Sequence, residues 1–89
     1  MAIYSVAYDL QRPGQNYPDL LRYLRSLESH HAQRSLWFVS TNMTVFQLRD
    51  ACQRYIDTTD LLFVSQMFKG YWASAYMTTA AAWLQARGL

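Results

Sequence analysis

The chain has 89 residues and a formal net charge of +2, with hydrophobic residues at 52% and aromatic residues at 16%. That length favours one domain over residues 1–89, and so small a charge does not by itself indicate a nucleic-acid-binding protein. The single cysteine excludes an intramolecular disulfide, and no apolar run approaches the roughly 18 residues of a membrane span. We therefore expect no membrane partner, no signal peptide and a cytoplasmic location.

The first predicted element is a strand at Ile3–Tyr8, which is rich in β-branched and aromatic residues. Its alternation separates a face of large side chains from a face of smaller ones, Ile3, Ser5, Ala7 and Asp9. The large side chains suit packing under helices. The small ones suit close approach of a second subunit, so we expect Ser5 and Ala7 in a dimer interface.

Asp9 places a carboxylate at the tip of this strand. One interpretation is that it caps the turn signalled by Pro13-Gly14, by accepting hydrogen bonds from backbone amides. The other is that it binds a hard cation. A single carboxylate with water holds Mg²⁺ weakly, and a twofold axis would add the carboxylate of a second subunit. The residues by themselves leave both interpretations open.

Three helices are predicted. The first covers about Pro18–Leu27, where leucines recur at helical spacing. A capping box at Thr44 and Gln47 begins the second. Its expected buried stripe is Val45, Leu48, Cys52, Tyr55 and Ile56. The third is short, at Ala80–Arg87, with the expected cap at Thr78 or Thr79 and the expected end at Gly88.

The remaining apolar segments read as strands. His30–Thr41 is either one long strand or two short ones bent near Arg34-Ser35, and further strands are expected at Leu61–Met67 and Tyr71–Met77. The resulting order is strand, helix, strand, helix, strand, strand, helix. This order predicts an α+β, ferredoxin-like sandwich, in which a single sheet carries its helices on one face. A second subunit would then cover the other face.

Basic residues offer a weak indication of a phosphate-binding role. All but one of them are arginines, and the planar guanidinium suits bidentate contact with phosphate, although a GC-rich genome would produce the same bias. Arg34 interrupts an otherwise apolar segment, so its side chain must reach an edge, an acid or a ligand. His30 and His31 are neighbours on a predicted strand, point to opposite faces and therefore cannot share one metal ion.

The tryptophans allow two interpretations as well. Stacking on nucleic-acid bases is one, and burial in a core or a dimer interface is the other. We expect Trp37 and Trp72 at an interface and Trp83 in the core.

Two motifs together resemble a known family. Tyr8-Asp9-Leu10 at the end of a strand, followed after a helix by the segment Gln33–Phe38, is similar to the second CRISPR-associated adaptation protein. In that family the first strand ends in Tyr-Asp-Ile or Tyr-Asp-Leu, and the second carries a Gln-x-Ser-x-Phe pattern, to which Gln33, Ser35 and Trp37 correspond. The virulence-associated protein D group of small ribonucleases shares the fold and the aspartate.

The chain is most similar to the SinR-like branch of this superfamily. The further matching residues are Pro13-Gly14, Tyr17, the Ser35-x-Trp37 pair, Arg49-Asp50 and Asp60-Leu61-Leu62. The resemblance covers the chain up to about Ser65 and is less characteristic after Lys69. The chain departs from the family pattern in one respect. The arginine cluster that often follows the aspartate is reduced here to Arg12.

The resemblance implies a homodimer with sheets face to face and a metal-associated Asp9 paired with its equivalent across the dimer axis. In an active member, Asp9 would be the catalytic and Mg²⁺-binding residue of an endonuclease, a hydrolase that cleaves RNA or DNA. Arg12, Arg34 and Ser35 would then contact the nucleic acid. The alternative is a non-catalytic dimeric scaffold that binds nucleic acid or protein, or, less specifically, a regulator of other proteins. Whether the chain is an enzyme thus depends on Asp9.

Overall fold

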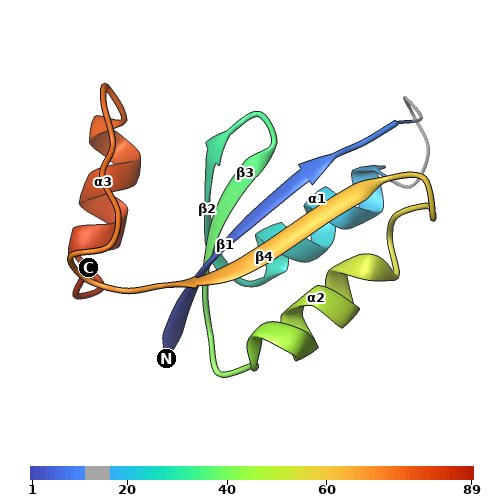
Figure 1. Cartoon of the computed structure of the whole chain (residues 1–89), viewed down its shortest axis with the longest axis horizontal. Helices are drawn as coiled ribbons and strands as arrows, with labels where there is room; N and C mark the ends of the chain where they lie inside the picture. The colour runs from blue at the N-terminus through green and yellow to red at the C-terminus, as the bar shows by residue number, and fades with distance from the viewer. Residues whose placement is uncertain (12–16) are drawn as a thin grey trace.

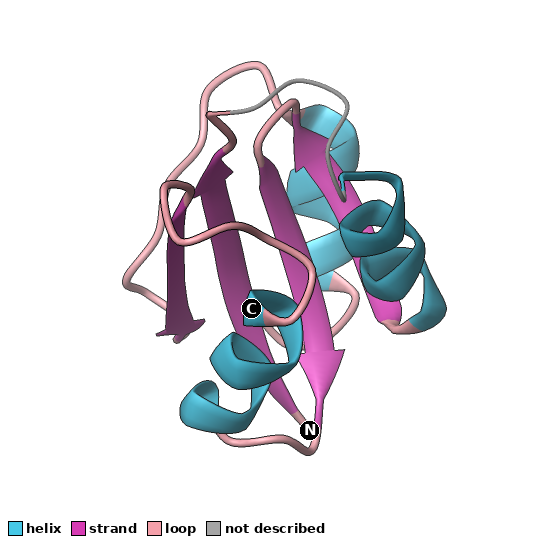
Figure 2. Cartoon of the chain, turned by 90° about the vertical axis from the view of Figure 1, so that its right-hand side faces the viewer, coloured by secondary structure: helices cyan, strands magenta, loops and turns pink. Residues whose placement is uncertain are grey.

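A computed structural model of the chain describes residues 1–11 and 17–89. Within them, one open antiparallel sheet contains β1 (Ala2–Asp9), β2 (Glu28–Gln33), β3 (Leu36–Thr41) and β4 (Leu61–Met67), in the order β2-β3-β1-β4. Three helices, α1 (Tyr17–Ser26), α2 (Val45–Gln53) and α3 (Thr78–Gln85), accompany it (Figure 1). The four strands form a single layer (Figure 2). In this part of the chain no helix is long and apolar enough to cross a membrane.

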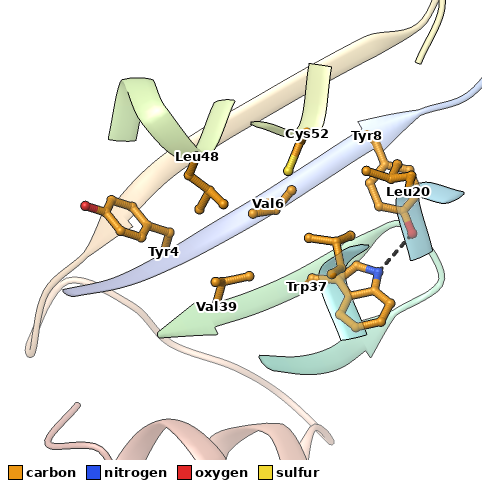
Figure 3. Packing of buried hydrophobic residues seen from close by; sticks show 9 residues of the cluster. Tyr4, Val6, Tyr8, Leu20, Trp37, Val39, Leu48 and Cys52 are labelled. Carbon is orange, nitrogen blue, oxygen red and sulfur yellow. Dashed lines mark hydrogen bonds between the residues drawn. The ribbon is translucent and has the colours of Figure 1, made fainter. Parts of the chain in front are cut away.

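The predicted alternation of β1 is confirmed. Tyr4, Val6 and Tyr8 are buried under α1 and α2, together with Leu20, Leu24, Leu48 and Cys52 (Figure 3). β1 is central in the sheet, and Val6 pairs with Trp37 of β3 on one side and with Val64 of β4 on the other. The indole Nε1 of Trp37 donates a hydrogen bond to the Tyr8 hydroxyl at 3.0 Å, which satisfies both polar groups inside the core.

The expectation that all helices lie on one face of the sheet is wrong. α3 packs on the opposite face, where Ala80 and Leu84, one helical turn apart, contact Ile3 and Phe38 (Figure 1). Arg87 links α3 to β2 through a contact with Glu28 at 3.0 Å. The second face is therefore partly covered by the chain itself, and only the remainder is open to a partner.

The His30–Thr41 segment forms two strands joined by a turn at Arg34-Ser35. The two adjacent histidines of β2 point to opposite faces, as predicted: the His31 ring stacks on Trp37 at 4.2 Å between centroids, and the His30 ring lies 6.1 Å from that of Trp83 in α3. Trp83 is half-buried and packs against the cluster that Ile3, Phe38, Ala80 and Leu84 form between α3 and the sheet. Its predicted packing role is thus confirmed.

The strand predicted at Tyr71–Met77 does not form. Residues 68–77 are irregular, with Gly70 at a φ of 85° and Tyr76 at a φ of 64°. An extended strand requires negative φ, so Tyr76, which lies inside the predicted strand, interrupts any ladder there. The order is therefore strand, helix, strand, strand, helix, strand, helix. The strand was predicted from the apolar residues of this segment, and such a short apolar run does not distinguish a strand from a packed loop.

One predicted helix cap is confirmed and one is wrong. Thr44 begins α2: its hydroxyl accepts from the Gln47 amide at 3.1 Å, and the Gln47 side chain accepts from the Thr44 amide at 2.9 Å. At α3 the N-cap is Met77, and no side chain caps it, so neither Thr78 nor Thr79 plays the predicted part. Gly88 does end that helix, with a φ of 91° that lets the Leu89 amide reach the Leu84 carbonyl at 3.1 Å.

Candidate functional site

Three of the predicted site residues lie at one end of the sheet. Asp9 is the last residue of β1, and the antiparallel register brings the β2–β3 turn to the same end. The Tyr8 amide donates to the Ser35 carbonyl at 3.1 Å, and the Tyr8 hydroxyl donates to the Arg34 carbonyl at 3.3 Å. The sheet thus brings Asp9, Arg34 and Ser35 to the same end. Arg12, the other predicted nucleic-acid contact, lies outside the described residues.

The Asp9 carboxylate is exposed, and no described residue donates a hydrogen bond to it or pairs with its charge. Only its backbone carbonyl is contacted, by the Gln11 side chain at 3.5 Å. The turn that Asp9 would cap, at Pro13-Gly14, lies outside the described residues. An exposed carboxylate that accepts no hydrogen bond from a described residue costs little to present to a cation.

A second carboxylate, Asp60, anchors this end of the fold, and sequence reasoning missed its role. Its side chain is buried, at 8% exposure, and accepts from the Gln11 amide at 2.8 Å and from the Asp57 amide at 2.7 Å. The Tyr17 hydroxyl also donates to it, at 3.4 Å. Asp60 therefore anchors the segment after β1 to the turn before β4.

The position of Asp60 follows from strand pairing. Asp9 pairs with Leu61, the first residue of β4, so the residue before Leu61 must lie beside the end of β1. The sequence holds the signal in Asp57-Thr58-Thr59-Asp60, where an aspartate comes directly before an apolar strand and three residues after another. The turn lies beside Asp9 because β1 pairs with β4 in a register that cannot be predicted from the sequence.

Beside Asp9, the uncovered part of the second sheet face is apolar. Cross-strand pairs share a face, so Ala7 and Asp9 lie next to Phe63 and Leu61. The side chains of Leu61 and Phe63 are 61% and 67% exposed. We call these four residues the open patch. Exposure of two large apolar side chains in so small a protein is typical of an interaction surface.

Two predicted interface residues lie elsewhere. Trp37 is 2% exposed and belongs to the core under α1, where its indole is not available to a partner. The physical reason is the strand pleat, which turns Trp37 to the same face as its cross-strand neighbour Val6. Ser5 is half-buried on the second face, its hydroxyl 3.0 Å from that of Ser65, and it lies close to α3 rather than in the open patch.

Asp9 fits a hard cation as one ligand, because carboxylate oxygen is the donor that Mg²⁺ prefers. In the described part of the chain no group of three or more histidine, cysteine, aspartate or glutamate side chains could hold a metal ion. Cys52 is fully buried, and burial raises the pKa of its thiol to about 11, so it offers no thiolate for catalysis.

Neither the comparison with protein-family models nor the comparison with solved structures finds a match for this chain.

Proposed function

We propose that the protein is a homodimeric, Mg²⁺-dependent endonuclease that cleaves RNA or DNA, related to the CRISPR-associated adaptation and virulence-associated protein D superfamily. The observation that carries this proposal is that the Asp9 carboxylate, at the end of the interior strand β1, is exposed and pairs with no described residue. The Asp60 carboxylate, in contrast, is occupied by backbone amides. The Asp9 carboxylate accepts no hydrogen bond from a described residue and is therefore open to a ligand.

The topology supports a ferredoxin-like domain. Up to the end of β4, the elements follow the order β-α-β-β-α-β, and the strand order is β2-β3-β1-β4 with every neighbouring pair antiparallel. Such an arrangement of two interleaved β-α-β units is the one that the ferredoxin-like fold has. α3 is an addition on the opposite face.

The open patch supports the dimer. Its apolar side chains, Leu61 and Phe63, lie beside Asp9, so a second copy that covers them across a twofold axis brings two Asp9 carboxylates near each other. Like charges at close range repel, and a cation relieves that repulsion. Asp9 and its equivalent in the second copy would hold Mg²⁺, which when bound activates water and neutralises charge that develops on a phosphodiester.

Arg34 is suited to hold the nucleic-acid backbone. It is exposed in the β2–β3 turn, and no described residue pairs with its guanidinium. A guanidinium fork matches a phosphate group in a bidentate manner. Ser35, next to it, offers a hydroxyl donor to the same backbone. These contacts would position the substrate without selecting its sequence.

A second candidate function is a non-catalytic dimeric scaffold that binds nucleic acid or protein. The observation that favours it is that no group of three or more histidine, cysteine, aspartate or glutamate side chains in the described part of the chain could hold a metal ion. The scaffold uses the same open patch and the same exposed arginine but cleaves nothing.

A cleavage assay separates the two functions. Wild type and Asp9→Asn are incubated with single- and double-stranded RNA and DNA, in Mg²⁺ and in chelator. The endonuclease proposal predicts metal-dependent cleavage by wild type and none by Asp9→Asn, with both folded to the same extent by circular dichroism. Cleavage that survives in Asp9→Asn refutes Asp9 as the catalytic residue, and binding without cleavage in wild type establishes the scaffold.

A further inference from the structure

A cavity of about 350 Å³ lies between the second face of the sheet and α3. Its floor is formed by β1 and β3, with Ser5 and Phe38 among the lining residues, and the irregular segment before α3 closes one side with Trp72 and Met77. Cavities of this size, apolar with a few polar groups, are typical of small-molecule sites. It is distinct from the Asp9 site, since none of Asp9, Arg34 and Ser35 lines it.

The lining of the cavity carries no charged side chain. A phosphate or carboxylate ligand would lose its hydration there without gaining a counter-charge, so the ligand that enters must be uncharged. Most of the lining residues are apolar, and they include two aromatic and two thioether side chains, those of Phe38, Trp72, Met67 and Met77. Aromatic rings are the partners that such side chains contact most favourably.

The side-chain amide of Gln33, which lines the cavity, has only one weak hydrogen bond to a described residue. The Gln33 side-chain amide donates to the thioether sulfur of Met77 at 3.6 Å, and sulfur is a weak acceptor. Its amide oxygen accepts no hydrogen bond from a described residue. Gln33 therefore presents one donor and one acceptor at the mouth of an aromatic, uncharged cavity.

We propose that this cavity binds an uncharged heteroaromatic ring of nucleobase size. Such a ring stacks on aromatic side chains, needs no counter-charge, and presents on its edge the paired donor and acceptor that a glutamine amide can satisfy. Adenine is the base whose edge suits a glutamine best, through its N6 donor and N7 acceptor. The ring arrives either as a free nucleoside or as an unstacked base of a single strand.

Calorimetric titration of the full-length protein tests the proposal with three probes: adenosine, a short single-stranded oligoadenylate, and the neutral apolar dye N-phenyl-1-naphthylamine. Adenosine is expected to bind saturably, one per chain. Binding of adenosine alone identifies a free nucleoside as the ligand. Binding of the oligoadenylate at the same site identifies an unstacked base. If the dye binds and adenosine does not, the cavity is merely apolar and the proposal is wrong.

Two matched variants locate the binding. Ala81→Leu adds three carbons at a residue that lines the cavity, whereas Ala82→Leu makes the same change at an exposed neighbour outside it. Ala81→Leu should weaken adenosine binding by about tenfold or more, as expected for a filled site, and Ala82→Leu should leave it unchanged. Equal thermal midpoints for the two variants exclude unfolding as the cause. Adenosine binding that survives Ala81→Leu overturns the proposal.

Gln33→Leu tests how the ring is recognised. Removing the amide should weaken adenosine binding by about tenfold, which corresponds to the loss of one bidentate contact, and leave dye binding unchanged. Equal loss for both probes would contradict recognition through the base edge. Asp9→Asn should bind adenosine as wild type does, so failure of this inference and failure of the endonuclease proposal are separate results.

Discussion

Two aspartates at the same end of the sheet occupy opposite environments. Asp60 is buried and accepts hydrogen bonds from backbone amides in both the segment after β1 and the turn before β4. Asp9 is exposed, and its carboxylate accepts no hydrogen bond from a described residue. A carboxylate that accepts buried amides is held by the fold and is poorly available to a ligand. The difference in surroundings therefore separates an anchoring residue from a candidate reactive one.

Alanine substitutions should reveal this separation as a difference in stability. Asp60→Ala leaves the Gln11 and Asp57 amides without their acceptor, and we expect a loss of roughly 1–3 kcal/mol in the free energy of unfolding. Asp9→Ala removes an exposed side chain and should change that free energy by no more than about 0.5 kcal/mol. Urea unfolding of both variants provides the measurement. Equal destabilisation by the two would mean that Asp9 is an anchoring residue as well.

Cys52 makes stability depend on alkaline pH. Burial raises the pKa of its thiol from 9.0 to about 11, so the folded state holds the proton more firmly than the unfolded state does. This contribution is fully present below pH 9.0 and is lost as the pH rises through about 11. The stability difference between wild type and Cys52→Ala should therefore shrink between about pH 8 and about pH 10.5. A difference that stays constant over this range would show that the thiol is not desolvated.

At the scale of single elements, the helices differ in how they begin. α2 starts with a complete capping box at Thr44, whereas α3 starts at Met77 without any side-chain cap and keeps its place through Ala80 and Leu84. Local hydrogen bonds thus define the start of α2. Tertiary packing defines the position of α3, in accord with the low intrinsic stability of short helices.

Thr44→Ala should lower the free energy of unfolding by about 1 kcal/mol, because the Gln47 amide loses its acceptor. Thr78→Ala is the matched control: Thr78 is the first residue of α3 and its hydroxyl caps nothing, so we expect a change within about 0.5 kcal/mol. Chemical denaturation of both variants gives the comparison. An unchanged midpoint for Thr44→Ala would show that the capping box does not contribute to stability.

For the whole molecule, the features that could be predicted from the sequence are those that neighbouring residues determine. Alternation in β1 assigned its faces correctly, and the capping box located α2, because both are set by neighbouring residues. The place of α3 across the sheet and the nearness of Asp60 to Asp9 depend on which strands pair and in which register. No local pattern encodes such long-range pairing, so the burial of Trp37 and the role of Asp60 required the structure.

The same limit applies to the candidate site. Asp9, Arg34 and Ser35 were singled out one by one from local patterns, and only the pairing of β1 with β3 shows that they lie at one end of the sheet. The sheet face expected to be free for a second subunit is smaller than predicted. The segment after β4 forms no strand, and α3 covers part of this face instead of lying with the other helices. The face that remains for a partner is the open patch, beside Asp9.

We propose that two copies meet at the open patch with their Asp9 carboxylates close together. Sedimentation equilibrium of wild type and Asp9→Asn, each with Mg²⁺ and with chelator, tests it most directly. We expect wild type to dimerise more tightly in Mg²⁺ than in chelator, and Asp9→Asn to dimerise in chelator at least as tightly as wild type, because a repulsion between carboxylates has been removed. The dimer affinity of Asp9→Asn should be the same in Mg²⁺ and in chelator. Wild type that remains a monomer, or a wild-type dimer whose affinity Mg²⁺ does not change, would contradict the claim.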